Sequence, residues 1–529
     1  MIAIALGQMI MSFNVASLPV AMGGMVKSFA VPPTTVATGI VAYSMLVAGF
    51  VMLGAKLCQR FGALRVFRGA IVLFCLAQIL MTFSPSATVM IIAQALCGMA
   101  GAVIVPALVA LIAENYRGSQ QATALGALGS ARAGAGVLAF VIGGILGTYI
   151  GWRPVFGILI AVSAIVFLLS FRLKPDEGRP DVTIDGVGVL LAASAIICIS
   201  FGFNNLNGWG LAVATANAPF NVLGASPASI LIVIGIFLGQ AFLWWTHKRE
   251  QVGKTPLLAL QVIDSPEERA AVYAMFAVVA LEAALNFSVP LYIQIVQGRS
   301  PIATAIAMMP FNLTVFFAAM LIVRFYEKLT PRQIGRYGFA LCTVALLWLA
   351  FVVRNDWSEF TVLLGLVLFG IGQGALVTLL FNVLVTASPK EIAGDVGSLR
   401  GTTNNLAAAV GTAVAGALLV GLLSAIALAG VTASPKLTPE LQAQVDLDNI
   451  NFISNERLQA VLANTGASPA QVAEAVQINS TARLRALKIG LLIMAGLASL
   501  SIIPAGRLPN YRPGEIPSEE VDPSHLRRS

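Results

Sequence analysis

The chain of 529 residues is 58% hydrophobic and only 11% charged, with a mean hydropathy of +0.87. These values exclude a series of ordinary soluble domains and indicate a polytopic membrane protein. The net charge of +8 would suit nucleic-acid binding, but the cations gather in short turns between apolar runs, which argues against that partner.

Apolar runs of about 20 residues, the length that crosses a bilayer, predict fourteen membrane-spanning helices. The long polar segment before the last run is the only sizeable soluble piece, and Ser/Thr-Pro pairs at 438–439 and 468–469 predict two short helices in it. In chain order, the spans are expected near residues 2–26, 35–57, 66–84, 87–113, 122–148, 152–171, 186–204, 226–246, 269–296, 302–325, 333–353, 359–386, 398–430 and 485–505.

The distribution of cations predicts the orientation of these spans. Of the 32 lysines and arginines, 21 lie in the turns after even-numbered spans or in the tail, whereas the short turns on the other side hold four. Because positive loops stay in the cytoplasm, both termini are expected there, in a cell (inner) membrane.

An offset of 268 residues relates two parts of the chain. It places Arg324, Lys328 and Arg336 on Lys56, Arg60 and Arg68, and it places 397–400 on 129–132. The sequence therefore predicts an all-α protein with two six-helix bundles and two helices inserted between them. The expected parts are an N-terminal bundle (1–173), inserted helices with linkers (174–262) and a C-terminal bundle (263–529), which includes an extracytoplasmic loop (431–483) and a cytoplasmic tail (506–529).

Glu282 is the only acidic residue deep within a predicted span. An ionised carboxylate costs several kcal/mol there, so we expect it to face a cavity or to take up a proton. Asn286 lies one turn further on the same helix face. The pair is a candidate for proton coupling; the alternative is a neutral glutamic acid that bonds to a neighbouring helix.

Other polar and aromatic residues within the spans are candidates for a substrate cavity. Arg132 and Arg400 occupy matching positions in the two halves, where they either contact substrate and gate the cytoplasmic mouth or merely anchor their helices. The alternative for the remaining residues is interhelical hydrogen bonding or core packing. They are Asn14, Tyr43, Gln94, Phe140, Tyr292, Asn312, Gln373 and Asn382.

These features resemble the major facilitator superfamily and, within it, the fourteen-helix drug/proton antiporter branch. The resemblance rests on Gly54–Arg68 between spans 2 and 3, Gly143-Gly144 in span 5, Trp152-Arg153, and segments 292–298 (YIQIVQG) and 507–513 (RLPNYRP). It implies alternating access between two bundles, as expected for parallel repeats about an axis normal to the membrane.

The same resemblance implies a cytoplasmic gating motif. Arg60 and Gly62 match the motif, whereas Gln59 replaces its acidic residue, Gln94 replaces the usual arginine of span 4 and Phe140 replaces a proline of span 5. Arg60 and Arg65 are implied to form gating ion pairs, with Glu114 as a substitute partner for Arg60 or Arg132. Alternatively, these cations only set the topology beside anionic lipid.

The sequence thus predicts a secondary active transporter that exports a lipophilic or amphipathic small molecule by proton antiport, and the resemblance implies a monomer. Its expected partners are the substrate, protons and membrane lipid, without nucleic acid, metal or cofactor. One alternative is an uncoupled translocator of lipids or other hydrophobes, and another is a scaffold or sensor that uses the 433–482 loop. An enzyme is not expected, because the sequence has no nucleophilic triad, phosphate-binding loop or metal cluster.

Overall fold

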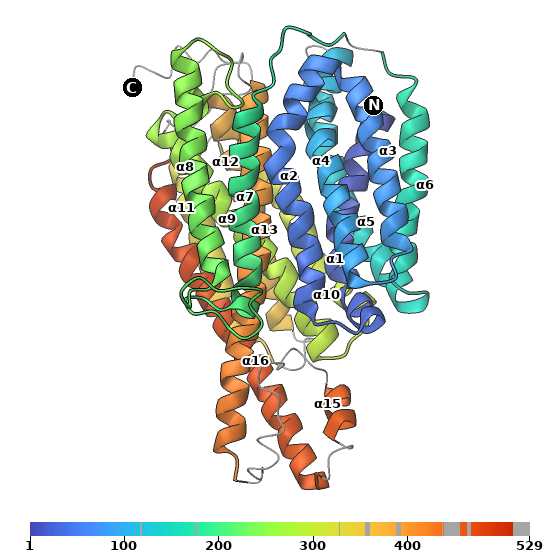
Figure 1. Ribbon diagram of the computed structural model, residues 1–529, viewed down its shortest axis with the longest axis vertical. Coiled ribbons are helices and arrows are strands. Elements are labelled where there is room, and N and C mark those ends of the chain that lie inside the picture. The colour runs from blue at the N-terminus through green and yellow to red at the C-terminus, as the bar shows by residue number, and fades with distance from the viewer. Residues whose placement is uncertain are drawn as a thin grey trace.

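The structure is a computed structural model, and it is helical almost throughout the part of the chain that it describes (Figure 1). In that part, the only β-type pairings are two isolated bridges at Ala225. The described residues are 1–116, 119–174, 177–326, 328–354, 360–387, 393–435, 437, 455–462 and 467–510.

Fourteen long helices correspond to the fourteen predicted spans. In chain order they are α1 (Ile2–Phe29), α2 (Pro33–Phe61), α3 (Ala63–Thr82), α4 (Ala87–Asn115), α5 (Ser119–Tyr149), α6 (Arg153–Ser170), α7 (Gly186–Trp209), α8 (Pro227–Gln251), α9 (Pro266–Leu291), α10 (Pro301–Leu321), α11 (Pro331–Val352), α12 (Phe360–Ala387), α13 (Ala393–Ala433) and α16 (Pro469–Leu500). Short helices are η1 (Leu260–Ile263), η2 (Tyr292–Val296), η3 (Ile322–Phe325), α15 (Asn455–Leu462) and α17 (Ile502–Ala505).

Thirteen of these helices are long enough and apolar enough to cross a membrane. The fourteenth, α5, carries a shorter apolar part, Gly134–Tyr149, after polar first turns. The prediction of an all-α polytopic membrane fold is confirmed. The division into parts at 173 and 262 stays a prediction.

Local sequence explains where several helices begin. Ser226, Ser265, Ser300, Thr330 and Ser468 cap α8, α9, α10, α11 and α16 with their side-chain oxygens, and a proline follows each of them. The hydroxyl accepts a bond from an otherwise unpaired backbone N–H, and proline has no N–H to leave unpaired at the first helical position.

The polar segment before the last span differs from the expected short helices. The cap at Ser468 is confirmed, but its helix runs without a break through Leu500, because no proline interrupts it and its polar residues tolerate helix. The pair at 438–439 lies outside the described residues. Figure 1 shows α13 and α16 projecting together beyond the other helices, with α15 beside α16. We call this the extracytoplasmic end and the opposite one the cytoplasmic end, as the charge distribution predicts.

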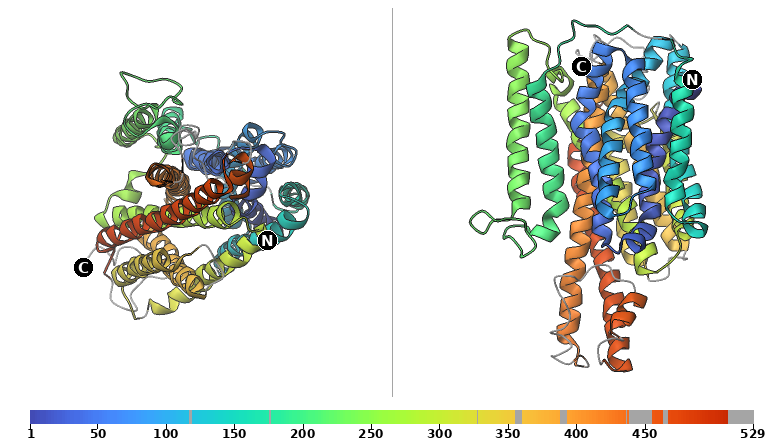
Figure 2. Two further views of the ribbon diagram at one scale, coloured as in Figure 1. Left: turned by 90° about the horizontal axis from the view of Figure 1, so that it is seen from below. Right: turned by 45° about the vertical axis from the view of Figure 1, so that its right-hand side comes forward.

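The two inserted helices, α7 and α8, pack against each other (Figure 2). α7 also contacts α2 and α13, and Gly49 of α2 brings the backbone of Ala193 close. The larger contacts between helices from the two halves are made by α2 with α13, α5 with α10 and α1 with α9, and smaller ones join α1 to α10 and η2 and α4 to α13.

Candidate functional site

The carboxylate of Glu282 on α9 is held by an amide from another helix. Nε2 of Gln373 on α12 donates to Oε2 of Glu282 over 2.7 Å. Gln373 is fully buried, whereas Glu282 is partly exposed. The amide is positioned by a glycine-rich stretch, since a Cβ on Gly374 would lie 2.4 Å from the carbonyl oxygen of Val315 on α10. This bond joins two residues that the sequence placed near mid-span.

One cation of the N-terminal half, Arg132, acts on this carboxylate, although its own side chain is exposed. Arg132 on α5 interacts electrostatically with Glu282, with Tyr43 on α2 and with Arg400 on α13. The guanidinium carbon of Arg400 lies 3.6 Å from the ring centroid of Phe381, a cation–π contact. The structure thus brings together five predicted residues, which we call the central polar site: Tyr43, Arg132, Glu282, Gln373 and Arg400.

Unsatisfied acceptors occur in the central polar site, at Gln373, and one helical turn after two of its members. In the part of the chain that the structure describes, the side-chain oxygens of Asn286, Gln373 and Asn404 are buried and accept no hydrogen bond. Asn286 follows Glu282 by one helical turn, and Asn404 follows Arg400 by one turn. Leaving a buried acceptor unpaired costs about 1–3 kcal/mol. Asn404 was not among the predicted site residues.

Asn14 and Gln94 lie instead inside the N-terminal helices and bond to each other. Nδ2 of Asn14 donates to Oε1 of Gln94 over 3.0 Å, and Gln78 of α3 donates to Oδ1 of Asn14 over 2.9 Å. All three residues are fully buried. Their geometry favours the interhelical hydrogen-bonding alternative. The sequence offered one unused signal, the isolated glutamine in the apolar run of α3.

The remaining cavity candidates have contacts of their own. Nδ2 of Asn312 donates to the Met308 oxygen one turn earlier over 2.9 Å, and Nδ2 of Asn382 donates to Tyr326 Oη over 3.1 Å. Phe140 is buried in the hydrophobic core. Tyr292 is buried at the extracytoplasmic end, where its hydroxyl donates to the Arg354 oxygen over 3.4 Å.

Gln294 in the π-helix η2 closes the contact between α1 and the C-terminal half. Its Oε1 accepts from the Gly23 N–H over 2.7 Å, and its Nε2 donates to the Pro19 oxygen over 3.0 Å. In a regular helix the Gly23 N–H bonds to the Pro19 oxygen, so the amide of Gln294 bonds to both groups of one helical turn of α1. A Cβ at Gly23 would lie 2.7 Å from Oε1, which explains the glycine. The sequence named Gln294 only within a motif.

At the cytoplasmic end, an ion pair joins α2 to α13. Nζ of Lys56 lies 3.8 Å from Oδ1 of Asp395, and both side chains are largely shielded from solvent. Oδ2 of Asp395 also accepts from the Ala259 N–H over 3.4 Å, which ties in the linker before α9. Neither residue was among the predicted site residues, because 339 positions separate them in the chain.

The predicted gating motif forms the turn between α2 and α3. Gly62 adopts φ 90°, which favours glycine. Arg60 donates to the Val182 oxygen over 3.5 Å, and the Gln59 oxygen accepts from the Arg179 N–H over 2.8 Å, so the linker after α6 lies against the turn. The side chains of Gln59, Arg65 and Glu114 are exposed. In the described part of the chain, no ion pair joins Glu114 to Arg60 or Arg132.

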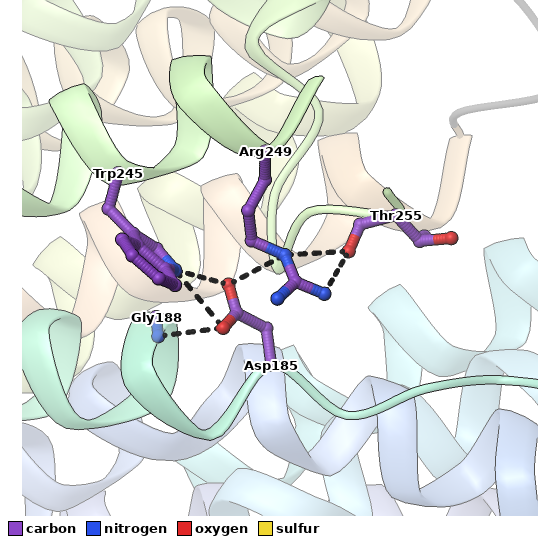
Figure 3. Close-up of polar contacts among 5 residues, drawn as sticks. All are labelled: Asp185, Gly188, Trp245, Arg249 and Thr255. Atoms are coloured by element: carbon purple, nitrogen blue, oxygen red, sulfur yellow. Dashed lines mark hydrogen bonds and ion pairs between the residues drawn. The ribbon is translucent and has the colours of Figure 1, made fainter. Parts of the chain in front are cut away.

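A separate polar cluster fastens the inserted helices at the same end (Figure 3). Asp185 caps α7 by accepting from the Gly188 N–H over 3.1 Å, and its carboxylate accepts from Nε1 of Trp245 over 3.1 Å. Nε of Arg249 lies 3.4 Å from Oδ2 of Asp185, and the same guanidinium donates to the Thr255 oxygen. The cluster gives α7 and α8 one fixed alignment.

Comparison with known proteins identifies relatives of this chain by sequence. Residues 4–412 match the sequence profile of the Major Facilitator Superfamily. The tetracenomycin C resistance and export protein of Streptomyces glaucescens is 25% identical over 71% of this chain and 67% of its own length. The multidrug efflux pump LfrA of Mycolicibacterium smegmatis is 23% identical over 75% of both chains.

Solved structures show the same fold. The bacterial homologue of the human lysosomal transporter Spinster, in its inward-facing and occupied form, superposes with a TM-score of 0.61 at 15% identity over 94% of this chain and 95% of its own. An auto-inhibited POT-family peptide transporter gives 0.59 at 15% identity over 95% of both chains. At this identity, the likeness extends to the fold alone.

Proposed function

Since the chain belongs to the major facilitator superfamily, we propose that it is a secondary active transporter that exports lipophilic or amphipathic small molecules. The antibiotic-export and drug-efflux relatives support this direction and substrate class. The expected setting is a cell membrane with both termini cytoplasmic and the protein working as a monomer. Labelling of single cysteines from either side of the membrane tests the orientation.

The proposed coupling ion is the proton, and the proposed carrier is Glu282. The observation that carries this proposal is the bond from Gln373 to Glu282, with Arg132 close by on a helix of the other half. While Glu282 is ionised, it is a counter-charge for Arg132, which lies in the other half and also faces the charge of Arg400. When Glu282 takes up a proton, Arg132 loses that counter-charge, and the repulsion between Arg132 and Arg400 favours separation of the helices that carry them. Protonation would thereby bias the alternating-access equilibrium.

The substrate proposal follows from the unsatisfied acceptors. Asn286, Gln373 and Asn404 each present a buried amide oxygen that lacks a donor in the described part of the chain. Tyr43 and Phe381 add aromatic surface near the two arginines. An amphipathic compound with N–H or O–H groups would satisfy these oxygens and place its apolar part against the aromatic side chains.

The test is pH-gradient-driven uptake of a fluorescent lipophilic substrate into everted vesicles. Glu282→Gln should abolish accumulation against the gradient while substrate exchange at zero gradient continues, because only coupling is lost. Glu267→Gln, in the first turn of the same helix, is the matched control and should behave as wild type. Full gradient-driven accumulation by Glu282→Gln would show that Glu282 does not couple transport to protons.

Two further outcomes separate the alternatives. Transport that ignores a protonophore in the wild type would favour uncoupled movement of a lipid or hydrophobe. That alternative is favoured by the neutral Gln94, which bonds to Asn14 where the family usually carries an arginine. Absence of any substrate flux, with function lost on deletion of the 433–482 loop, would favour a scaffold or sensor.

A further inference from the structure

An apolar groove lies on the C-terminal helices, apart from the central polar site. It has a volume of about 360 Å³ and is lined by α9, α13, α16 and α17. Leu281 and Ala284 of α9 line it, whereas Glu282 bonds to Gln373 on α12. The groove and the central polar site therefore use different faces of α9.

The residues that line the groove are almost all apolar. Its two serines are already satisfied within their helices, since Ser288 donates to the Ala284 oxygen over 2.6 Å and Ser501 donates to the Leu497 oxygen over 2.7 Å. The close packing of α13 on α9 is fixed by Gly411, where a Cβ would lie 2.3 Å from the Ala280 oxygen. An aliphatic chain matches such a lining.

The length of the groove suits a lipid tail. Its lining on α9 runs from Tyr273 to Ser288, a rise of about 22 Å at roughly 1.5 Å per residue. Half the hydrocarbon core of a bilayer is about 15 Å thick. The groove therefore extends from the cytoplasmic boundary past the middle of the membrane, and several of its rim residues are exposed where lipid would surround the protein. Among them, Tyr273 is 66% exposed and Leu500 is 61% exposed.

Cations mark the cytoplasmic mouth of the groove. Arg269 lies one turn before Tyr273 on α9, and Arg507 follows the end of α17. Both side chains are exposed, and α17 packs against α9. The acid next to Arg269, Glu268, is buried and accepts from the Ser265 N–H over 2.9 Å in the capping box of its own helix. Arg269 and Arg507 can therefore bind an anionic group at the membrane surface.

We propose that this groove binds one anionic phospholipid of the cytoplasmic leaflet. An acyl chain lies along α9 and α16, and the phosphate lies at the mouth beside Arg269 and Arg507. The site is independent of substrate transport, so the experiment below does not depend on the proposed export function.

The experiment is native mass spectrometry of the full-length, delipidated protein with equimolar dioleoyl phosphatidylglycerol and dioleoyl phosphatidylcholine. The wild type should retain one phosphatidylglycerol in preference. Arg269→Ala and Arg507→Ala should each reduce that preference about fivefold, as expected for one cation near an anionic lipid. Lys254→Ala removes an exposed cation from the linker before α9 and should leave the preference unchanged.

A second pair of variants tests the apolar part. Ala277→Trp fills the groove and should abolish retention of both lipids, whereas Val233→Trp, on an exposed position of α8, should retain them. If Ala277→Trp does not fold, Ala415→Leu on the α13 wall serves the same purpose. Equal retention of the two lipids by the wild type would overturn the proposal. So would phosphatidylglycerol retained by the filled groove, or a stable dimer that carries no lipid.

Discussion

Nε2 of Gln373 and Oε2 of Glu282 lie 2.7 Å apart, on helices α12 and α9. A donor at this distance to a carboxylate makes a strong, charge-assisted bond. It fixes the orientation of the one acid that lies deep in a predicted span. The two residues are 91 positions apart in the chain.

We expect Gln373→Leu to reduce gradient-driven transport by about tenfold or more, because hydrogen bonds to charged groups contribute about 1.5–3 kcal/mol. Uptake into everted vesicles measures the effect, with protein amount normalised by fluorescence of a fusion tag. Thr378→Val, on the same helix, removes a hydroxyl that donates to the Ala319 oxygen and not to Glu282, and it should keep wild-type transport. Unchanged transport by Gln373→Leu would show that the bond has no role in coupling.

Gln294→Leu should weaken the closure at the extracytoplasmic end. It removes both bonds to α1, at about 1 kcal/mol each, so the population open at this end should rise by roughly 30-fold. Gly23→Ala should act in the same direction, because its Cβ would lie 2.7 Å from Gln294 Oε1. Distances between spin labels at Lys27 and Ile306, from electron paramagnetic resonance, report the change.

Gly69→Ala is the control for the glycine variant, since a Cβ there meets nothing within 4 Å. If both Gln294→Leu and Gly23→Ala give the wild-type distance distribution, Gln294 is not what holds α1 against η2.

Asp395→Asn should destabilise the protein by about 1–3 kcal/mol, because it leaves Lys56 buried without its counter-charge. Lys56→Met should cost less than Asp395→Asn, because Asp395, which it leaves without a counter-charge, is the more exposed of the two side chains and still accepts from the Ala259 N–H. The double variant Lys56→Met/Asp395→Asn should be more stable than Asp395→Asn alone. Thermal unfolding in detergent measures all three, and equal melting temperatures would contradict a role for this pair.

Arg483 should hold α15 against α16. Its side chain is fully buried, its Nε donates to the Asn479 oxygen over 3.3 Å, and its Nη2 donates to Oδ1 of Asn455 in α15. Arg483→Lys should speed hydrogen–deuterium exchange in Asn455–Leu462, because an ammonium cannot reproduce the fork of a guanidinium. Arg485→Lys, at an exposed position two residues later, is the matched control. Identical exchange in the two variants would exclude this role.

The sequence by itself determined the number of long helices, their approximate bounds and the capped start of α16. Hydrophobic length and Ser-Pro or Thr-Pro caps are local quantities, so neighbouring residues suffice to predict them. It also identified Glu282 as a candidate, because an acid within a long apolar run is energetically costly and can be recognised without knowing its neighbours in the fold. It missed the continuity of α16 through its polar half, since polarity alone does not end a helix.

Only the tertiary structure decided which polar groups meet. It joined Glu282 to Gln373, joined Lys56 to Asp395, and turned Asn14 and Gln94 toward each other inside the N-terminal helices. The physical reason is that a membrane-spanning helix is apolar on nearly every face, because lipid and protein interior are alike in polarity. Hydrophobic patterning therefore leaves the rotation of each helix unspecified, and close packing at glycines such as Gly374 and Gly411 fixes it.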